Sequence, residues 1–282
     1  MLSILLPTDF SKNAMNAITY ALLFLKQQEV QFYIMNACKN QLYNYNDVVT
    51  DKMITTVLRT IKNESQQNLE NVLHTIKEIA PNSKFTFHTI SSNNTLVEEA
   101  NTIADEKNID LIVMGTKGKS NNRNMVFGSQ TFQVLKYVCC PVLAIPAGYT
   151  NTQPKRILFP TNFLMPYKAR ELKLLALLAK LNQSHIELLY ISISNKLSRR
   201  QEQNNGFIKE ALQDNTVQFS INNGEKLEET IINYVKEKNI DMITMVNTKH
   251  SFLEDMLFPS AIDNVGLELN IPLLAMQNTH RN

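Results

Sequence analysis

The chain has 282 residues, more than one domain of ordinary size needs and enough for two. With 44% hydrophobic residues, a mean hydropathy of −0.20 and 9 prolines, its composition is that of a folded soluble protein and excludes a disordered or fibrous one. The formal net charge of +2 argues against a protein built mainly to neutralise a nucleic acid or a membrane surface, so we expect neither as a partner.

The N-terminus and the cysteines indicate a cytoplasmic protein. The opening apolar run is too short for a signal peptide or a membrane span, and Asp9 interrupts it. Cys38, Cys139 and Cys140 are an odd number without CxxC spacing, which suits a reducing compartment. The five histidines show no HxxxH or HExxH spacing, so we predict no metal site made of protein side chains alone.

In the first half of the chain, short apolar runs rich in β-branched or aromatic residues predict five strands. These runs are LSILL, QFYIM, KFTFHTI, DLIVM and PVLAI. Between them, apolar residues at helical spacing predict helices at 13–26, 48–79, 95–107 and 129–138. This alternation predicts βαβ units and therefore an α/β fold, a parallel sheet covered by helices on both faces.

The second half repeats this pattern. Its predicted strands are RILF, IELLYI, VQFSI, DMITMV and PLLAM, with a short second helix near 197–212. ILLPTDF at 4–10 returns as ILFPTNF at 157–163, an offset of 153, whereas EKNIDLIVMGTKGKS at 106–120 returns as EKNIDMITMVNTKHS at 237–251, an offset of 131. The second copy is therefore 22 residues shorter, and the loss lies between its first and fourth strands.

The boundary between the copies falls in the polar stretch AGYTNTQPKR at 147–156, where glycine and proline interrupt the apolar pattern. We therefore expect two domains, residues 1–150 and residues 151–282.

A glycine-containing loop carries the chemistry of the first copy. The chain has only 7 glycines, yet Gly115, Gly118 and Gly128 fall within 14 residues directly after the strand DLIVM, in the pattern G-x2-G-x9-G-S. Glycines at a strand end let backbone N–H groups approach an anion, and the helix that starts near Ser129 adds its positive end. Gln130 and Thr131 would extend this cradle for phosphate oxygens.

Other phosphate motifs fit less well. A P-loop ending at Gly118-Lys119-Ser120 would need its first glycine at Val113, inside the strand, and no strand is followed by GxGxxG. An ordinary loop with turn glycines is the remaining alternative, and the spacing favours phosphate binding over it. For Lys117, Lys119 and Arg123, a solvated basic loop is the favoured interpretation.

The PTDFS turn at 7–11, the G-x2-G-x9-G-S loop and the closing strand CPVLAIP at 140–146 together closely resemble the universal stress protein family. The resemblance covers both halves of the chain. It implies two tandem Rossmann-like (adenine nucleotide alpha hydrolase-like) domains, each with a five-stranded parallel sheet of order 3-2-1-4-5. It also implies that the first domain binds ATP, alone or with Mg²⁺, where the strand order reverses between strands 1 and 4, which is where open α/β sheets bind ligands.

Carried over by position, the resemblance implies a set of ligand contacts in the first domain. On the adenosine side these are Pro7, Thr8 and Asp9, with Ala37 approaching the adenine. The ribose and phosphates would be held by Met114, Gly115, Gly118, Gly128, Ser129 and Gln130. For Asp9, capping of the following helix is the alternative role.

The second copy lacks this loop. At the offset of 131, the three glycines are replaced by Val246, Lys249 and Pro259, while Ser260 survives in place of Ser129. Asn162 also replaces Asp9 in the first turn. We therefore predict that the second domain is degenerate and does not bind ATP in the same manner.

The family resemblance also implies pairing of domains through their fifth strands. CPVLAIP and IPLLAMQ are apolar, and an apolar edge strand is a liability unless it is paired. We therefore predict that the two domains pair within the chain as a pseudo-twofold, and leave a homodimer open.

The resemblance implies a cytosolic stress-response regulator or nucleotide sensor that binds ATP. One alternative is an enzyme that uses adenine nucleotides, such as a slow ATP hydrolase; because no base, nucleophile and oxyanion set converges, we predict no catalytic residue. The other alternative is an interaction scaffold without nucleotide, with the helix at 48–79 as its docking surface.

Overall fold

The computed structural model describes residues 1–39, 51–116, 127–164, 166–192, 196–223, 227–247 and 270–277, apart from the side chains of 51–55 and 227–228. By its contacts the chain divides into two compact units. The first unit comprises Met1–Asn122 and Phe127–Cys140, and the second comprises Arg123–Val126 and Pro141–Asn282.

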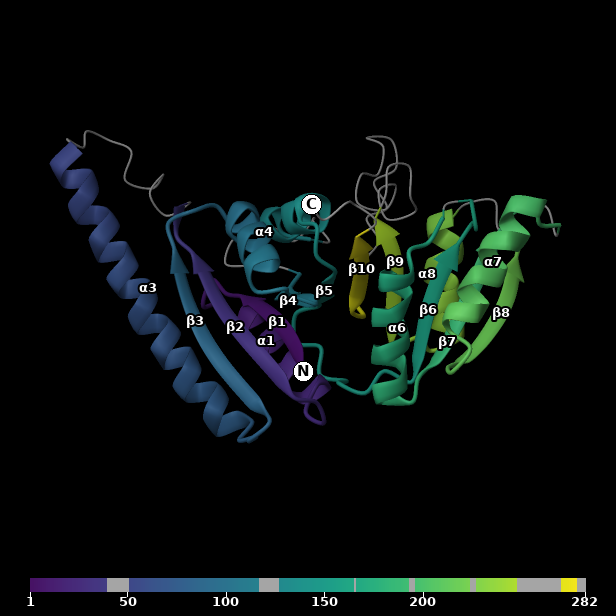
Figure 1. The fold of residues 1–282 in the computed structure, drawn as a ribbon, viewed down its shortest axis with the longest axis horizontal. Coiled ribbons are helices and arrows are strands. Elements are labelled where there is room, and N and C mark those ends of the chain that lie inside the picture. The colour runs from purple at the N-terminus through teal and green to yellow at the C-terminus, as the bar shows by residue number, and fades with distance from the viewer. Residues whose placement is uncertain are drawn as a thin grey trace. The chain divides into compact units, whose positions relative to one another are not determined.

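The first unit alternates strands and helices (Figure 1). In chain order the elements are β1 (Leu2–Pro7), α1 (Lys12–Phe24), β2 (Val30–Ala37), α3 (Asp51–Ile79), β3 (Phe85–Ser92), α4 (Leu96–Glu106), β4 (Leu111–Gly115) and α5 (Ser129–Tyr137). Its strands form a parallel sheet in the order β3-β2-β1-β4. The strand order reverses at β1, because β2 and β4 pair with its two sides.

The second unit repeats the arrangement and adds one strand. Its elements are β5 (Val142–Ile145), β6 (Arg156–Thr161), α6 (Ala169–Asn182), β7 (His185–Ile191), α7 (Arg199–Ala211), β8 (Thr216–Asn222), α8 (Leu227–Glu237), β9 (Met242–Asn247) and β10 (Leu273–Gln277). The order β8-β7-β6-β9-β10 is parallel throughout and confirms the predicted order 3-2-1-4-5 in this copy. β5, the last strand of the first copy, pairs antiparallel with β10.

Helices cover both faces of these sheets. Because parallel crossovers are right-handed, α6 and α7 lie on one face of the second sheet and α8 on the other (Figure 1). The central strands between the two layers are buried; all residues of β4 and β10 are examples. The predicted α/β fold class, mostly parallel with helices on both faces, is therefore confirmed.

The shortening of the second copy is largely in one helix. α3 has 29 residues and its counterpart α7 has 13. Most of the 22 missing residues therefore lie between the second and third strands of the repeat.

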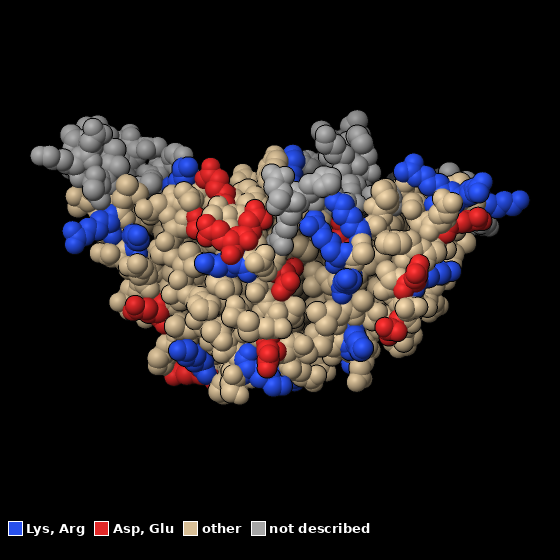
Figure 2. All heavy atoms as spheres, viewed as in Figure 1, with Lys and Arg blue, Asp and Glu red and all other residues tan. Residues whose placement is uncertain are grey.

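Charges of both signs are distributed over the face drawn in Figure 2, as the net charge of +2 leads one to expect. Within the described ranges, no helix combines the length and the apolar character that crossing a membrane requires.

Candidate functional site

The predicted ligand residues meet at one edge of the first sheet. Parallel neighbouring strands end on the same side, and the register pairs Pro7 of β1 with Met35 of β2, and Leu5 of β1 with Ile112 of β4. The carboxyl ends of β1, β2 and β4 are therefore adjacent. They bring together Pro7, Thr8, Asp9, Ala37, Met114 and Gly115. Gly118 lies outside the described residues.

The turn after β1 is held by its own side chains. Thr8 Oγ1 accepts a hydrogen bond from the Phe10 amide at 3.0 Å, and Asp9 Oδ1 accepts one from the Ser11 amide at 3.0 Å. Between them Phe10 has a φ of 62°, a left-handed conformation that is costly for a bulky residue. The N-cap of α1 is Ser11, whose Oγ accepts from the Ala14 amide at 3.2 Å. Asp9 thus shapes the turn that precedes the helix and is not its N-cap.

The second copy builds the same turn without the negative charge. Thr161 Oγ1 accepts from the Phe163 amide at 3.0 Å, and Asn162 Oδ1 accepts from the Leu164 amide at 2.9 Å. Phe163 has a φ of 54°. An amide oxygen therefore does for this turn what the carboxylate of Asp9 does in the first copy. The bond that closes the turn therefore does not require a charged residue at the position of Asp9.

The start of α5 is fixed against the end of β4 by two hydrogen bonds. The Gly128 amide donates to the Thr116 carbonyl at 2.7 Å, and Thr131 Oγ1 donates to the Gly115 carbonyl at 2.8 Å. Thr131 is buried, so its hydroxyl serves the fold, and the prediction for this residue rests on its backbone amide. Ser129 is exposed and Gln130 half-buried at the same helix start.

The N-terminus of α5 differs from those of α1 and α4. Gly128 is its N-cap, and within the described residues no side chain makes a capping hydrogen bond there. α1 and α4 are capped by Ser11 and Thr95. The first-turn amides and the positive dipole end of α5 therefore suit an anion at the edge where β1 and β4 end.

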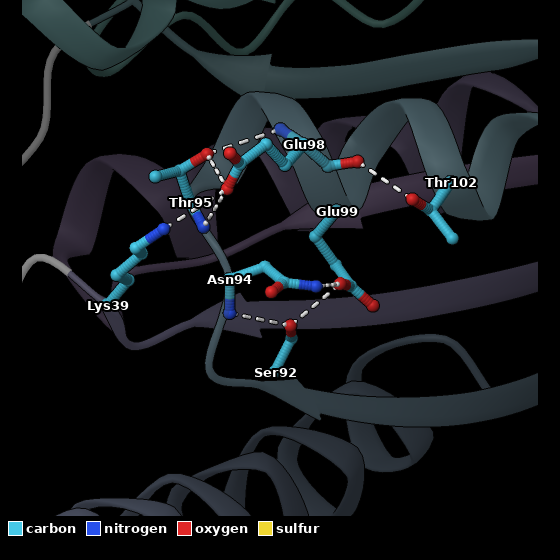
Figure 3. A network of polar contacts seen from close by, with 7 residues as sticks. All are labelled: Lys39, Ser92, Asn94, Thr95, Glu98, Glu99 and Thr102. Carbon is cyan, nitrogen blue, oxygen red and sulfur yellow. Dashed lines mark hydrogen bonds and ion pairs between the residues drawn. The ribbon is translucent and has the colours of Figure 1, made fainter.

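At the start of α4, by contrast, side chains of the protein itself make the hydrogen bonds (Figure 3). Thr95 and Glu98 form a reciprocal capping box, and the hydrogen bonds from Thr95 lower the pKa of Glu98. Lys39, just after β2, lies with its Nζ 3.6 Å from the same carboxylate. Glu99 Oε2 accepts from Ser92 Oγ at 2.7 Å. The protein's own carboxylates therefore occupy this helix start.

Gly115 is favoured by packing as well as by the predicted site. A Cβ at this position would lie 3.0 Å from the carbonyl oxygen and 3.2 Å from the carbonyl carbon of Asn13, in the first turn of α1. α1 therefore approaches β4 so closely that a side chain at this position would push the Asn13 backbone away by a few tenths of an ångström. Gly128, by contrast, has a φ of −63°, which any residue adopts.

The second unit has bulky side chains at the edge where the first unit has the close approach of α1 to Gly115. Val246, the counterpart of Gly115, is buried in β9. Tyr167, ahead of α6, is buried with its hydroxyl hydrogen-bonded to Thr161 Oγ1 and its ring edge-on to Phe159. Burial raises the pKa of Tyr167 to about 12, so the phenol stays neutral at physiological pH. Tyr167 thus packs against the last residues of β6. Lys249, Pro259 and Ser260 lie outside the described residues.

Sequence reasoning missed Asn13, Thr116 and Asn36. Asn13 and Thr116 contact the loop through backbone atoms, which leave no signal in residue type. Asn36 does leave one, because an amide side chain within the apolar run of β2 has to find buried partners. In the described ranges, no group of three or more His, Cys, Asp or Glu side chains is arranged to hold a metal ion.

The chain is similar in sequence and fold to known proteins. The sequence profile described as the universal stress protein family matches residues 1–146. Universal stress protein MJ0577 of Methanocaldococcus jannaschii is 25% identical over 150 residues, which are 50% of this chain and 93% of that protein. YxiE of Bacillus subtilis, also a universal stress protein, is 27% identical over 146 residues, 50% of this chain and 96% of its own.

Among solved structures, a universal stress protein from Archaeoglobus fulgidus DSM 4304 superimposes on this chain with a TM-score of 0.68 and 17% sequence identity. The match covers 98% of this chain and 96% of that protein. At this identity the likeness concerns the fold, and it extends over both copies of the repeat. Together with the profile match over more than half of the residues, these findings show that the chain belongs to the universal stress protein family.

Proposed function

We propose that the first domain binds ATP, alone or with Mg²⁺, at the carboxyl edge of β1 and β4, and that the protein acts as a nucleotide-responsive regulator in the cytoplasmic stress response. The observation that carries this proposal is the start of α5. It follows Gly128 directly, lacks a side-chain cap within the described residues, and is held to the end of β4 by the Gly128–Thr116 and Thr131–Gly115 hydrogen bonds.

In this proposal the phosphates lie against the first-turn amides of α5, with Ser129 and Gln130 as side-chain donors. Gly115 and Gly118 allow the loop backbone to approach the phosphates. The nucleoside lies over the end of β1, where Pro7, Thr8 and Asp9 follow one another, with Ala37 beside the adenine and Met114 beside the ribose. The charge of Asp9, which the turn does not need, would accept hydrogen bonds from ribose hydroxyls.

The second domain, residues 151–282, is proposed not to bind ATP. Val246 stands where the first copy has Gly115, and Tyr167 packs against the last residues of β6. The proposed contribution of this domain is architectural, as partner of residues 1–150 within the chain.

Calorimetric titration of the full chain with ATP, AMP and cyclic AMP tests the proposal. We expect one ATP per chain, and weaker binding of AMP, which has fewer phosphate oxygens for the α5 amides. No heat of binding at millimolar ATP would contradict the proposal. Two ATP per chain would contradict the assignment of the second domain.

A turnover assay with ATP and Mg²⁺ separates regulation from catalysis. We expect bound nucleotide to be recovered unchanged, because no catalytic constellation is found among the described residues. Steady release of phosphate or pyrophosphate would instead favour the enzyme alternative.

A further inference from the structure

Asn36, near the end of β2, is a buried amide that joins three elements. Its side-chain nitrogen Nδ2 donates to the Thr8 carbonyl at 2.7 Å. Its oxygen Oδ1 accepts from Ser65 Oγ of α3 at 2.9 Å and from Cys38 Sγ at 3.0 Å. The residue is 2% exposed, so breaking one of these bonds would leave a polar group without water to replace it.

On α3, the bond to Asn36 is made by Ser65, a polar residue in an otherwise apolar stripe. The buried residues of α3 lie on one face at spacings of three and four: Ile61, Ser65, Leu69, Val72 and Ile76. Ser65 is the polar member of this stripe, and its hydroxyl also accepts from Ser91 Oγ of β3 at 2.8 Å. These bonds specify which turn of α3 lies against the ends of β2 and β3.

At the proposed nucleotide site, the bond from Asn36 to the Thr8 carbonyl helps to fix the turn after β1. The Thr8 amide donates to the Met35 carbonyl at 2.8 Å, its hydroxyl accepts from Phe10, and its carbonyl accepts from Asn36. The amide, the carbonyl and the hydroxyl oxygen of Thr8 therefore all take part in holding the turn. Pro7 and Asp9, on either side of it, take their positions from these bonds.

The second copy makes the same connection with different residues. Gln201 Nε2 of α7 donates to the Asn162 carbonyl of the corresponding turn at 2.8 Å and to the Tyr190 hydroxyl at 3.2 Å. The buried positions of α7 and the residue after it have the spacing of the α3 stripe from Ser65 onward: Gln201, Asn205, Ile208 and Leu212. Gln201 is thus the polar residue of the α7 stripe that reaches the turn, as Ser65 reaches the first turn through Asn36. The link between helix and turn is kept although its residues differ.

We propose that Asn36 and Ser65 are positioning residues of the nucleotide site and that they couple its occupancy to the docking of α3 on the sheet. This inference rests on the proposed function. A nucleotide that contacts the turn favours the turn geometry in which Thr8 accepts from Asn36, and this geometry favours the docked α3. The coupling is reciprocal: the factor by which a bound nucleotide favours the docked α3 equals the factor by which undocking of α3 weakens nucleotide binding.

The test uses the full chain and the variant Ser65→Ala, which removes the hydroxyl and leaves the apolar stripe. ATP affinity is measured by calorimetry, and hydrogen exchange is followed in residues 61–76 with and without ATP. We expect ATP to slow exchange in this segment of the wild type. In Ser65→Ala we expect about fivefold to tenfold weaker ATP binding and loss of this slowing.

The matched control is Gln201→Ala, which breaks the corresponding link in the second unit. It should lower thermal stability as Ser65→Ala does and leave ATP affinity unchanged. Equal ATP affinity of Ser65→Ala and wild type, with α3 protected in both, would overturn the coupling and leave the ATP proposal standing. Equal losses of affinity in both variants would reduce the link to a purely structural role. A wild type that binds no ATP would overturn both proposals.

Discussion

At the scale of single residues, Glu171 is a carboxyl group in an unfavourable environment. It lies in the first turn of α6 and is 1% exposed. Its Oε2 accepts from the Lys168 amide at 3.2 Å, whereas among the described residues Oε1 has no hydrogen-bond partner. By the spacing of the buried positions, Ala17 stands at this place in α1. Burial raises the pKa of Glu171, and the Lys168 amide and the charges of Lys168 and Arg170 offset this only in part.

Glu171→Gln is therefore expected to stabilise the second unit at neutral pH. Because the pKa is raised above 4.5 in the folded state, the cost of holding the ionised group is absent below about pH 4.5 and grows as the pH rises through the folded-state pKa. We expect a gain of about 1 kcal/mol at pH 7 and almost none at pH 4, measured by chemical denaturation. The exposed Glu202→Gln in the same unit is the control; equal effects of the two substitutions at pH 7 would contradict this account.

At the scale of elements, the contact between α1 and β4 explains a difference between the two copies. In the first copy, the carbonyl oxygen of Asn13 lies only 3.0 Å from where a Cβ on Gly115 would be. In the second, Val246 supplies a side chain, and α6 starts at Ala169, after the buried Tyr167. A glycine at this strand end thus accompanies an early helix start, and a valine accompanies a later one.

This contact separates two glycine substitutions. Gly115→Ala should destabilise the first unit by about 1–3 kcal/mol, because the backbone of α1 has to move. Gly128→Ala carries no torsional penalty at a φ of −63°, so we expect nearly unchanged stability and weaker ATP binding. Thermal unfolding and calorimetry of both variants check this. Unchanged ATP affinity in Gly128→Ala would argue against phosphates at the start of α5.

At the scale of the whole molecule, the architecture was predictable because each buried parallel strand is an apolar run and each copy repeats the run. The helix predicted at 48–79 is α3, Asp51–Ile79, and the short one near 197–212 is α7, Arg199–Ala211. The position of the ligand edge followed from the same pattern, since strand order determines which carboxyl ends are neighbours.

The contacts that decide the use of each edge were not predictable from the sequence. Asn36 bonds Ser65, 29 positions away, and the Gly115–Asn13 approach involves backbone atoms of two distant segments. Nothing in the sequence around Tyr167 indicates that its ring packs against β6 and does not point into solvent. Residue type and spacing describe a segment, whereas these contacts depend on how separate segments pack.

The pairing of β5 with β10 has a practical consequence for anyone who expresses half of this protein. Leu273, Leu274 and Ala275 face Ala144, Leu143 and Val142 across an antiparallel ladder. A fragment that starts at residue 151 lacks β5, so the apolar strand β10 becomes an unpaired edge that can associate with other copies of the fragment. A fragment that starts at Pro141 keeps β5 and therefore the pairing. Light scattering should find the shorter piece self-associated and the longer one monomeric; two monomers would mean that the ladder shields nothing.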